Sequence, residues 1–371
     1  RERSLLVALA VLWGMTYTAA VIGAGEDPEN PSASGFAMGY SHADGYEATD
    51  GIELVAVADI VPENAEAFAD AYDIGDDGVF EDYNEMLAAV EPDVVSVCVP
   101  PALHESISVD CIRSGVVEAV HCEKPMALTY GGATRMAQAA TRRDVHLTFN
   151  HQRRFGRPFR KAKELLDAGE IGALERVEFA ASNVYDYGSH SFDLSNYYTD
   201  QATPAWVLAG IDYREPNVFF GAHNENHAVV QWAYENGITG LATTGVGEAS
   251  IACHNRLVGT EGVIEVGAHD QDDGVLRIRR DGDGWESLDT DDEGLHDDVY
   301  IHRAIADVVE GVDTGEPSEL DAANALDATE IIFGVWESAR RRGRVEFPLE
   351  IDDNPLEAMV EAGDLGFDPT E

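Results

Sequence analysis

The segment His121–Ala127, HCEKPMA, contains one of only three lysines in a chain of 371 residues, whose other basic residues are arginines. Lys124 follows an apolar run typical of a buried strand and precedes Pro125, so we expect it at the carboxyl end of a strand. A lysine there carries a compact ammonium that can donate to an oxygen becoming a carbonyl or an alkoxide. The alternative interpretation is an ordinary surface lysine.

The stretch YDYGSHSFDL places Asp186 and His190 four residues apart, with Asp193 three residues further on. A helix that begins near Ser189 would put His190 and Asp193 on one face, and Gly188 would permit a sharp entry. A histidine with an acid one turn away is a plausible general base held in one tautomer. The alternative is a capping aspartate beside a structural histidine.

The run VIGAG closes an apolar segment with Gly23 and Gly25, a pattern typical of a dinucleotide-binding turn. The next glycine of that pattern, Gly39, follows an insertion of 13 residues. Asp59 ends the second apolar run, where a carboxylate would bind the ribose hydroxyls of NAD and repel the 2′-phosphate of NADP. NAD is therefore favoured over NADP. A plain tight turn and an N-cap aspartate remain the alternatives.

The elements that must position these residues alternate between strand and helix in the first part of the chain. Helix-period segments at 62–72 and 102–115 separate the Val-rich runs, a pattern typical of an open parallel sheet buried on both faces. The predicted strands are 16–23, 53–59, 93–100, 117–123 and 145–150.

After about residue 150 the strands become longer and alternate in polarity, and Asn-Gly, Glu-Gly and Asp-Gly turns join several of them. This pattern indicates a C-terminal α+β region with a large, mostly antiparallel open sheet. Helices are expected at 160–172, 295–313 and 321–342. We expect an extension or a mis-called start at 1–14, an NAD(P)-binding Rossmann domain at 15–147, and a substrate and oligomerisation domain at 148–371.

The composition excludes some functions and suggests an environment. A formal net charge of −46 disfavours binding to nucleic acid or to anionic membranes. Frequent apolar runs argue against disorder, so dense carboxylates and scarce lysine favour adaptation to high salt. The four cysteines form no CxxC pair and suit a reducing cytoplasm. Residues 1–14 resemble a short signal peptide but run directly into the first strand, and cytoplasmic location is expected.

Several motifs together resemble the Gfo/Idh/MocA family of oxidoreductases (glucose–fructose oxidoreductase and inositol dehydrogenase). The resemblance runs from Met15 to about Pro348 through CEKP, ALT, GEIG, DYGSHSFDL and GTEG, in this order. GYSHA at 39–43 resembles the family's GxxHA, and VPPALHESI resembles its Pro and His beside the nicotinamide. The insertion after Gly25 departs from the family pattern.

This resemblance implies a Rossmann domain, an α+β domain that often forms the oligomer interface, and a cis bond before Pro125. It implies a homo-oligomer (dimer or tetramer) that uses NAD on a sugar, an inositol or a related polyol. His190 would take the hydroxyl proton, Asp186 would orient it or hold a neighbouring hydroxyl, and Lys124 would stabilise the oxyanion. Other residues are expected to bind cofactor (Gly23, Gly25, Gly39, Asp59, Pro100, His104, Glu123 and Lys124) or substrate (Asn150, Arg154 and Asp193).

Two other classes of function remain open. One is a cofactor-binding sensor without chemistry, and the other is a glycosidase or epimerase that oxidises its substrate transiently and recycles NADH. His223 and His227 have a zinc-like spacing but precede a strand, and no third ligand is evident, so no metal site is predicted.

Overall fold

The computed structural model describes residues 16–26, 37–268 and 274–365, so the predicted extension at 1–14 and most of the insertion after Gly25 lie outside the described residues. The chain divides into two compact units, which are described separately. Of the described residues, the first unit comprises those up to 127 together with 134–152 and 298–323, and the second comprises those within 128–133, 153–297 and from 324 onward.

The first unit contains a parallel sheet of six strands in the order β3-β2-β1-β4-β5-β6, which is the dinucleotide-binding order. Its Val- and Ala-rich central strands are buried, as expected when helices cover both faces. The strands are β1 (Tyr17–Ile22), β2 (Ile52–Ala58), β3 (Val79–Phe80), β4 (Val94–Val97), β5 (Ala119–Cys122) and β6 (His146–Phe149).

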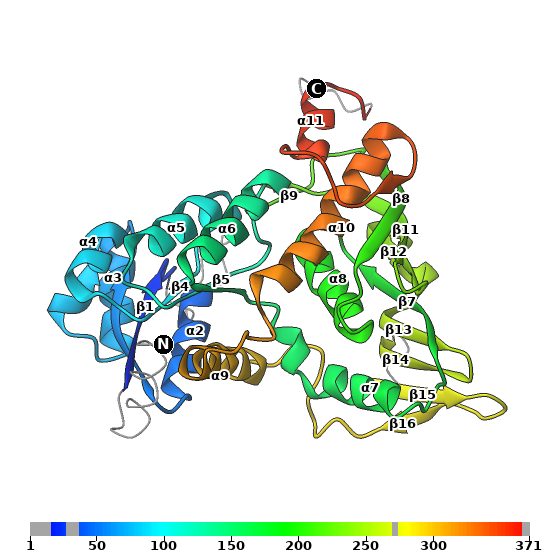
Figure 1. The fold of residues 1–371 in the computed structure, drawn as a ribbon, viewed down its shortest axis with the longest axis horizontal. Helices are drawn as coiled ribbons and strands as arrows, with labels where there is room; N and C mark the ends of the chain where they lie inside the picture. The colour runs from blue at the N-terminus through cyan, green and yellow to red at the C-terminus, as the bar shows by residue number, and fades with distance from the viewer. Residues whose placement is uncertain (1–15, 27–36, 269–273, 366–371) are drawn as a thin grey trace. The chain divides into compact units, whose positions relative to one another are not determined.

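Helices cover the two faces of this sheet. On one face α2 (Met38–Glu47) packs beside α3 (Pro62–Ala71) and α9 (Val299–Thr314). On the other face lie α5 (Pro101–Ser114) and α6 (Tyr130–Arg143), with α4 (Tyr83–Val90) beside α5 and the short η1 (Asp76–Gly78) before β3 (Figure 1). The predicted helices at 62–72 and 102–115 are confirmed.

The second unit contains a mixed, mostly antiparallel sheet, as the sequence predicted. Among the described residues its order is β16-β15-β14-β13-β7-β12-β11-β8-β17, and β7 and β12 form its parallel pair. The strands are β7 (Leu174–Ala181), β8 (Pro204–Asp212), β11 (His227–Tyr234), β12 (Thr239–Thr244), β13 (Cys253–Gly259), β14 (Gly262–Ala268), β15 (Leu276–Arg280), β16 (Glu286–Leu288) and β17 (Val345–Glu346), with β9 (Val218–Phe219) and β10 (Ala222–His223) paired separately.

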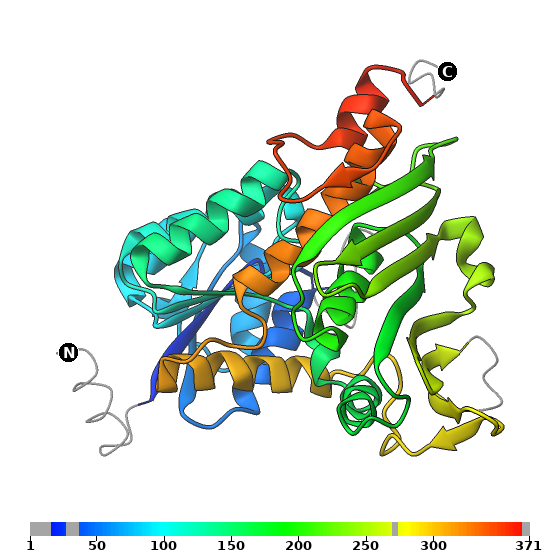
Figure 2. The same cartoon turned by 45° about the vertical axis from the view of Figure 1, so that its right-hand side comes forward.

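One face of this sheet is packed against helices (Figure 2). The rings of Phe179, Phe192 and Trp232 meet edge-on or tilted, with centroids 4.8–5.8 Å apart, and join the sheet to α8 (Asp186–Tyr198). The opposite face leaves Leu208 and Val229 exposed at 43% and 47%. The remaining helical segments are η2 (Gln152–Phe155), α7 (Arg157–Asp167), η3 (Gly245–Ser250), α10 (Ala322–Arg341) and α11 (Pro355–Glu361).

Each unit is built from segments that are not contiguous in sequence. The predicted boundary between residues 147 and 148 falls inside β6, and α9 belongs to the first unit. A Cβ on Gly45 of α2 would lie 2.8 Å from Ile305, so glycine permits the close packing of α2 on α9. In the described part of the chain, no helix is both long enough and apolar enough to cross a membrane.

Candidate active site

The three predicted cofactor-binding glycines meet at the end of β1. Gly23 and Gly25 have φ values of 88° and 76°, in the left-handed region that favours glycine. A Cβ on Gly39 would lie 2.8 Å from the carbonyl oxygen of Gly23, although 13 residues separate Gly39 from Gly25. The turn therefore keeps the bare backbone that a pyrophosphate needs, beside the first turn of α2.

Asp59 stands at this glycine turn. Its Oδ2 accepts a hydrogen bond from the Gly25 N–H at 3.1 Å, and its Oδ1 accepts one from the Val61 N–H at 2.9 Å. The carboxylate thus steadies the entry into α3 and faces the glycine turn, so the two sequence interpretations are compatible. A bare glycine cradle with an acid at its side fits a dinucleotide.

Lys124 follows the carboxyl end of β5, and the Lys124–Pro125 peptide bond is cis, which confirms the predicted bond. The main-chain N–H of Lys124 donates to Glu123 Oε2 at 3.3 Å. Ligands of open parallel sheets bind at this edge, where β1 also delivers its glycines. The fold therefore places Lys124 at the edge of the sheet where chemistry is expected.

Glu123 and Asn150 turn inward and bind one another. The side-chain amide of Asn150 donates to Glu123 Oε1 at 2.7 Å, and His42 Nε2 lies 3.0 Å from the same oxygen. Burial alone would raise the pKa of Glu123, but the hydrogen bonds from His42 and Asn150 and the charges of His42 and Lys124 lower it to about 2. The predicted contacts of Glu123 with cofactor and of Asn150 with substrate stay predictions.

His104 ties together two loops at this edge. Its ring is fully buried, and its nitrogens lie 2.8 Å from the carbonyl oxygens of Val99 and Pro125. Burial lowers the pKa of His104, while the two carbonyls oppose that shift. Pro100, the other residue expected beside the nicotinamide, is the N-cap residue of α5. The described contacts give His104 a positioning role, and its contact with a cofactor stays a prediction.

In the second unit, α8 presents both predicted catalytic residues. The helix begins at Asp186, three residues earlier than predicted, because Asn183 Oδ1 accepts the N–H groups of Asp186 and Tyr187 at 2.8 and 3.1 Å. A Cβ on Gly188 would lie 2.6 Å from the Asn183 carbonyl oxygen, so the entry requires glycine. Asp186 and His190 are buried one turn apart on this helix.

Asp193, the second acid of the motif, is paired with a residue outside α8. Its carboxylate is bound on both oxygens by Arg154, with Nε–Oδ2 and Nη2–Oδ1 distances of 2.6 and 2.7 Å, and both side chains are 2% exposed. A buried carboxylate needs such a partner, because leaving water is costly without one. Two of the three residues predicted to bind substrate, Arg154 and Asp193, are thus brought together as an ion pair with each other.

Sequence analysis missed a buried acid that supports α8. Glu225 accepts hydrogen bonds from the Val184 N–H and the Thr244 hydroxyl, both at 2.8 Å, and from the Trp336 indole N–H at 3.2 Å. Burial raises its pKa. Glu225 is the central residue of HNENH, between the two histidines. His223 contacts Tyr213. The described residues contain no group of three or more potential metal ligands.

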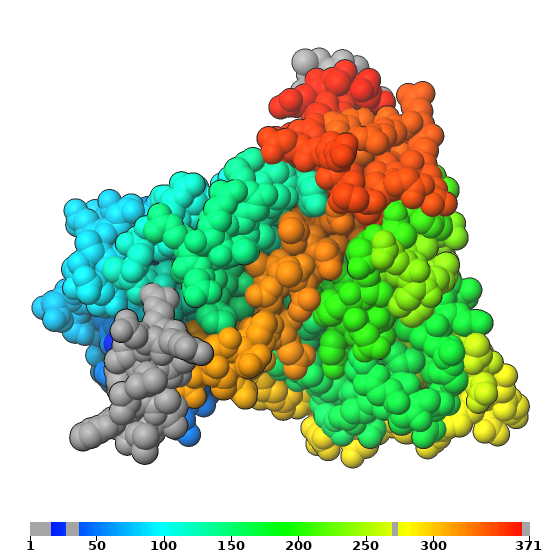
Figure 3. Space-filling view, in the orientation of Figure 1, coloured from blue at the N-terminus to red at the C-terminus, as the bar shows by residue number. Residues whose placement is uncertain are grey.

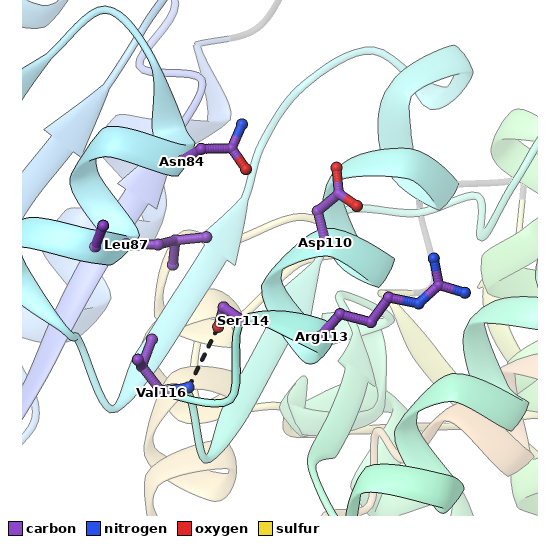
Figure 4. Close-up of a pocket in the computed structure, with 7 residues that line it drawn as sticks. Asn84, Leu87, Asp110, Arg113, Ser114 and Val116 are labelled. Atoms are coloured by element: carbon purple, nitrogen blue, oxygen red, sulfur yellow. Dashed lines mark hydrogen bonds between the residues drawn. The ribbon is translucent and has the colours of Figure 1, made fainter.

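Two hollows lie on the surface of the first unit. One, of about 430 Å³, is lined by the C-terminal end of α5, including Arg113 and Ser114, and by Asn84 and Leu87 of α4 (Figure 4). A second is lined by residues of α5 and α6, whose teal atoms are among those visible in Figure 3. Ser114 precedes the start of β5 whereas Lys124 follows its end, so the first hollow is remote from the glycine turn.

The sheet order and the glycine turn define an NAD-binding Rossmann domain. Residues 33–151 match the family model described as an oxidoreductase family with an NAD-binding Rossmann fold, which is the Gfo/Idh/MocA family. The match covers about a third of the chain, so the likeness to this family concerns the NAD-binding part of the chain.

Two curated relatives have named activities. The chain is 35% identical over 133 residues to D-glucoside 3-dehydrogenase of Escherichia coli, covering 36% of this chain and 37% of the relative. It is 25% identical over 175 residues to myo-inositol 2-dehydrogenase of Thermotoga maritima, covering 43% and 51%. The chain thus spans between about a third and a half of the length of these two relatives.

Solved structures resemble nearly the whole chain. An Agrobacterium radiobacter oxidoreductase in complex with NAD⁺, L-tartaric acid and magnesium has a TM-score of 0.74 at 16% identity, covering 90% of this chain and 98% of its own. An Azotobacter vinelandii inositol dehydrogenase homolog in complex with NADH and myo-inositol has a TM-score of 0.73 at 19% identity, with the same coverage. At this identity the likeness concerns the fold.

Proposed function

We propose that this protein is an NAD-dependent oxidoreductase that transfers a hydride between nicotinamide and a hydroxyl-bearing carbon of a sugar, an inositol or a related polyol. The observation that carries the proposal is the position of Lys124 at the carboxyl end of β5, in the sheet whose first strand ends in the glycine cradle. The names of the D-glucoside and inositol dehydrogenases among the relatives support a polyhydroxylated substrate.

NAD⁺, when bound, supplies the hydride acceptor. Gly23, Gly25 and Gly39 let the backbone approach the pyrophosphate, and Asp59 accepts hydrogen bonds from the ribose hydroxyls. The Asp59 carboxylate would repel a 2′-phosphate, so NAD is preferred to NADP. Pro100, with the loop that precedes α5, would border the nicotinamide.

Three side chains would act on the substrate. His190 takes the proton of the reacting hydroxyl, and Asp186 orients His190 or holds a neighbouring hydroxyl. Lys124 donates to the developing oxyanion. Lys124 lies in the first unit, and His190 and Asp186 lie in the second. Arg154 and Asp193, as a fixed ion pair, and Asn150 are the proposed substrate-binding residues.

We further propose a cytoplasmic protein adapted to high salt that works as a dimer or tetramer. The support is a net charge of −46, the scarcity of lysine, and an open sheet face on which Leu208 and Val229 are exposed. Sedimentation equilibrium in concentrated KCl tests the oligomeric state, and a monomer at every accessible concentration would contradict it.

The activity is tested by following NADH absorbance with purified protein in concentrated KCl, using NAD⁺ or NADP⁺ and a panel of aldoses, inositols and polyols. We expect NADH to form with one class of substrate and with NAD⁺ in preference to NADP⁺. Protein that binds NAD⁺ but reduces none of it with any substrate would contradict a dehydrogenase. Product analysis on glycosides would then distinguish an enzyme that recycles NADH from a sensor without chemistry.

A further inference from the structure

A row of polar side chains crosses the first unit's sheet where apolar side chains are normal. Ser96 on β4 is aligned with His121 on β5, which is aligned with Thr148 on β6. All three are buried, and Ser96 contacts two residues of α2: Tyr46 at 2.8 Å and His42 Nδ1 at 2.9 Å. Burying polar groups costs free energy unless they are hydrogen-bonded, so the hydrogen-bond partners of this row must be accounted for.

The donors and acceptors in this network fit one orientation. An ionised Glu123 only accepts hydrogen bonds, so His42 Nε2, which lies 3.0 Å from Glu123 Oε1, carries a proton and donates it. The other ring nitrogen, Nδ1, lies 2.9 Å from the Ser96 hydroxyl, which in turn lies 2.8 Å from the Tyr46 hydroxyl. Ser96 and Tyr46 thus hold the ring in the orientation that lets His42 donate to Glu123.

This network ends on the main chain of Lys124. His42 and Asn150 hold one oxygen of Glu123, and the other oxygen accepts the Lys124 N–H at 3.3 Å. On the far side of the cis bond, a ring nitrogen of His104 lies 2.8 Å from the carbonyl oxygen of Pro125. The Lys124–Pro125 segment is therefore held from two sides by buried side chains.

We propose that His42 is a positioning residue for Lys124, because its hydrogen bond holds the Glu123 carboxylate that binds the Lys124 main chain. His42 has no assigned contact with reacting atoms. Its effect on turnover rests on the proposed function, which makes Lys124 catalytic, whereas the contact with the Lys124 amide can be measured independently. A shift of about 1 Å in a catalytic group can lower a rate about 100-fold.

The test compares two amides in place of the imidazole, in the full-length protein with saturating NAD⁺ and concentrated KCl. The amide of His42→Asn reaches the position of Nδ1, so it keeps the contact with Ser96 and loses Glu123. The amide of His42→Gln reaches the position of Nε2 and can donate to Glu123. Because the chain has only three lysines, ¹⁵N-lysine labelling gives three main-chain amide signals, and Lys124→Arg assigns the signal of Lys124.

We expect His42→Asn to lower kcat about 10–100-fold, to leave the Kd for NAD⁺ within about threefold, and to accelerate hydrogen exchange of the Lys124 amide at least about tenfold. His42→Gln should return both quantities to within about threefold of wild type. The amides of Lys161 and Lys163 should be unchanged in both variants.

The matched control is His121→Asn. His121 is equally buried, and its ring centroid lies 5.0 Å from that of His42, but its Nδ1 contacts Thr148. This variant should leave exchange of the Lys124 amide unchanged. If His42→Asn does not fold, Ser96→Ala frees Nδ1 of His42 and should accelerate the same exchange to a smaller degree.

The proposal is overturned if the Lys124 amide stays as protected in the folded His42→Asn or Ser96→Ala variant as in wild type. It is also overturned if His42→Gln loses as much turnover and protection as His42→Asn, because His42 would then act only by filling space. A wild-type protein that oxidises no polyol would remove the proposed function instead. The exchange measurement would still decide whether His42 holds Lys124.

Discussion

Lys124 remains a lysine in a chain whose basic residues are almost all arginine. An ammonium is a compact donor on a flexible stem, whereas a guanidinium is a wide planar fork, so arginine cannot occupy the same place beside a reacting oxygen. We expect Lys124→Ala and Lys124→Arg both to lower kcat about 100- to 1,000-fold while NAD⁺ still binds. Steady-state kinetics and calorimetric titration with NAD⁺ check this.

Lys161→Arg is the matched control, because Lys161 is a partly exposed lysine that forms an ion pair with Glu164 on the same helix. Its activity should equal that of wild type. A Lys124→Arg variant with near-normal turnover would remove the ammonium from the mechanism.

His190 is expected to act as the general base, a role that typically contributes about 100- to 10,000-fold. His190→Ala should lose that factor in kcat and keep NAD⁺ binding. Groups that act in one step are not additive, so the double variant with Lys124→Ala should lose far less than the product of the two single losses. Fully multiplicative losses would indicate that the two residues act in separate steps.

Asp59 is expected to decide between the two nicotinamide cofactors. Its carboxylate lies 3.1 Å from the Gly25 nitrogen, where it would bind ribose hydroxyls and repel a 2′-phosphate. We expect Asp59→Ser to weaken NAD⁺ binding about 10-fold and to improve the ratio of kcat/KM for NADP⁺ over NAD⁺. An unchanged ratio in the variant would mean that Asp59 serves only the entry into α3.

At the scale of elements, the apolar runs predicted most of the Rossmann strands because parallel strands buried on both faces leave a continuous signal. The short β3 and α4 were not predicted. The three glycines were identified by type, but only the fold could show that Gly39 packs against Gly23 after the insertion of 13 residues that follows Gly25. Helix α8 begins earlier than predicted, because the side-chain oxygen that accepts its first N–H groups belongs to Asn183, upstream of the DYGSHSFDL motif.

The same limit applies to polar residues inside elements. Ser96 and His121 sit within apolar strands, and nothing local indicates that their partners come from α2 and from β6. Likewise, the spacing of His190 and Asp193 correctly predicted a shared helix. The ion pair between Arg154 and Asp193 could not be predicted in this way, because it depends on tertiary packing. Local patterns predict which residues are candidates, whereas contacts distant in sequence decide their partners.

Asp327, on helix α10, is an acid whose surroundings disfavour its ionised form. Burial and the charge of Glu330 raise the pKa of Asp327 to about 6. The folded protein therefore holds this proton more tightly than the unfolded chain, so stability falls as pH rises from about 4 to 6. Asp327→Asn should stabilise the protein at pH 7 by about 1–2 kcal/mol, after allowance for partial exposure, and by almost nothing at pH 4.

Chemical denaturation at the two pH values measures this difference at constant salt. Asp321→Asn, near the start of the same helix, is a control, because Asp321 Oδ1 accepts the Ala323 N–H at 2.8 Å as an N-terminal cap. That variant should not stabilise the protein at pH 7. An equal gain for Asp327→Asn at both pH values would contradict the argument from its pKa.

At the scale of the whole molecule, the chain returns to its first unit after building most of its second. The 298–323 segment, which contains α9, joins the Rossmann unit, and α10 then enters the other unit. A domain boundary inferred from a change of sequence pattern cannot reveal that α9 belongs to the first unit. Helix α9 is an amphipathic helix like many others, and its partner α2 lies far upstream. Tyr46 of α2 and Ile305 of α9 belong to the same hydrophobic core, which shows that the two helices pack together.

The net charge makes stability depend on salt. With 70 acidic residues against 24 Lys and Arg, repulsion between carboxylates outweighs the attraction of the exposed ion pairs, and salt weakens both. The buried pair of Arg154 and Asp193 is shielded from solvent and should change little. Since the Debye length falls from about 10 Å at 0.1 M to about 3 Å at 1 M, the thermal unfolding midpoint should rise steeply over that range of KCl.

The rise should shrink near pH 4, where many carboxylates are protonated and the repulsion is smaller. Sucrose serves as the control, because it strengthens burial by exclusion without screening charge. A midpoint that rises with sucrose but not with KCl at pH 7 would contradict electrostatic screening. A midpoint that falls with KCl would mean that the exposed ion pairs outweigh the repulsion among the acids, and that the acidic surface is not an adaptation to salt.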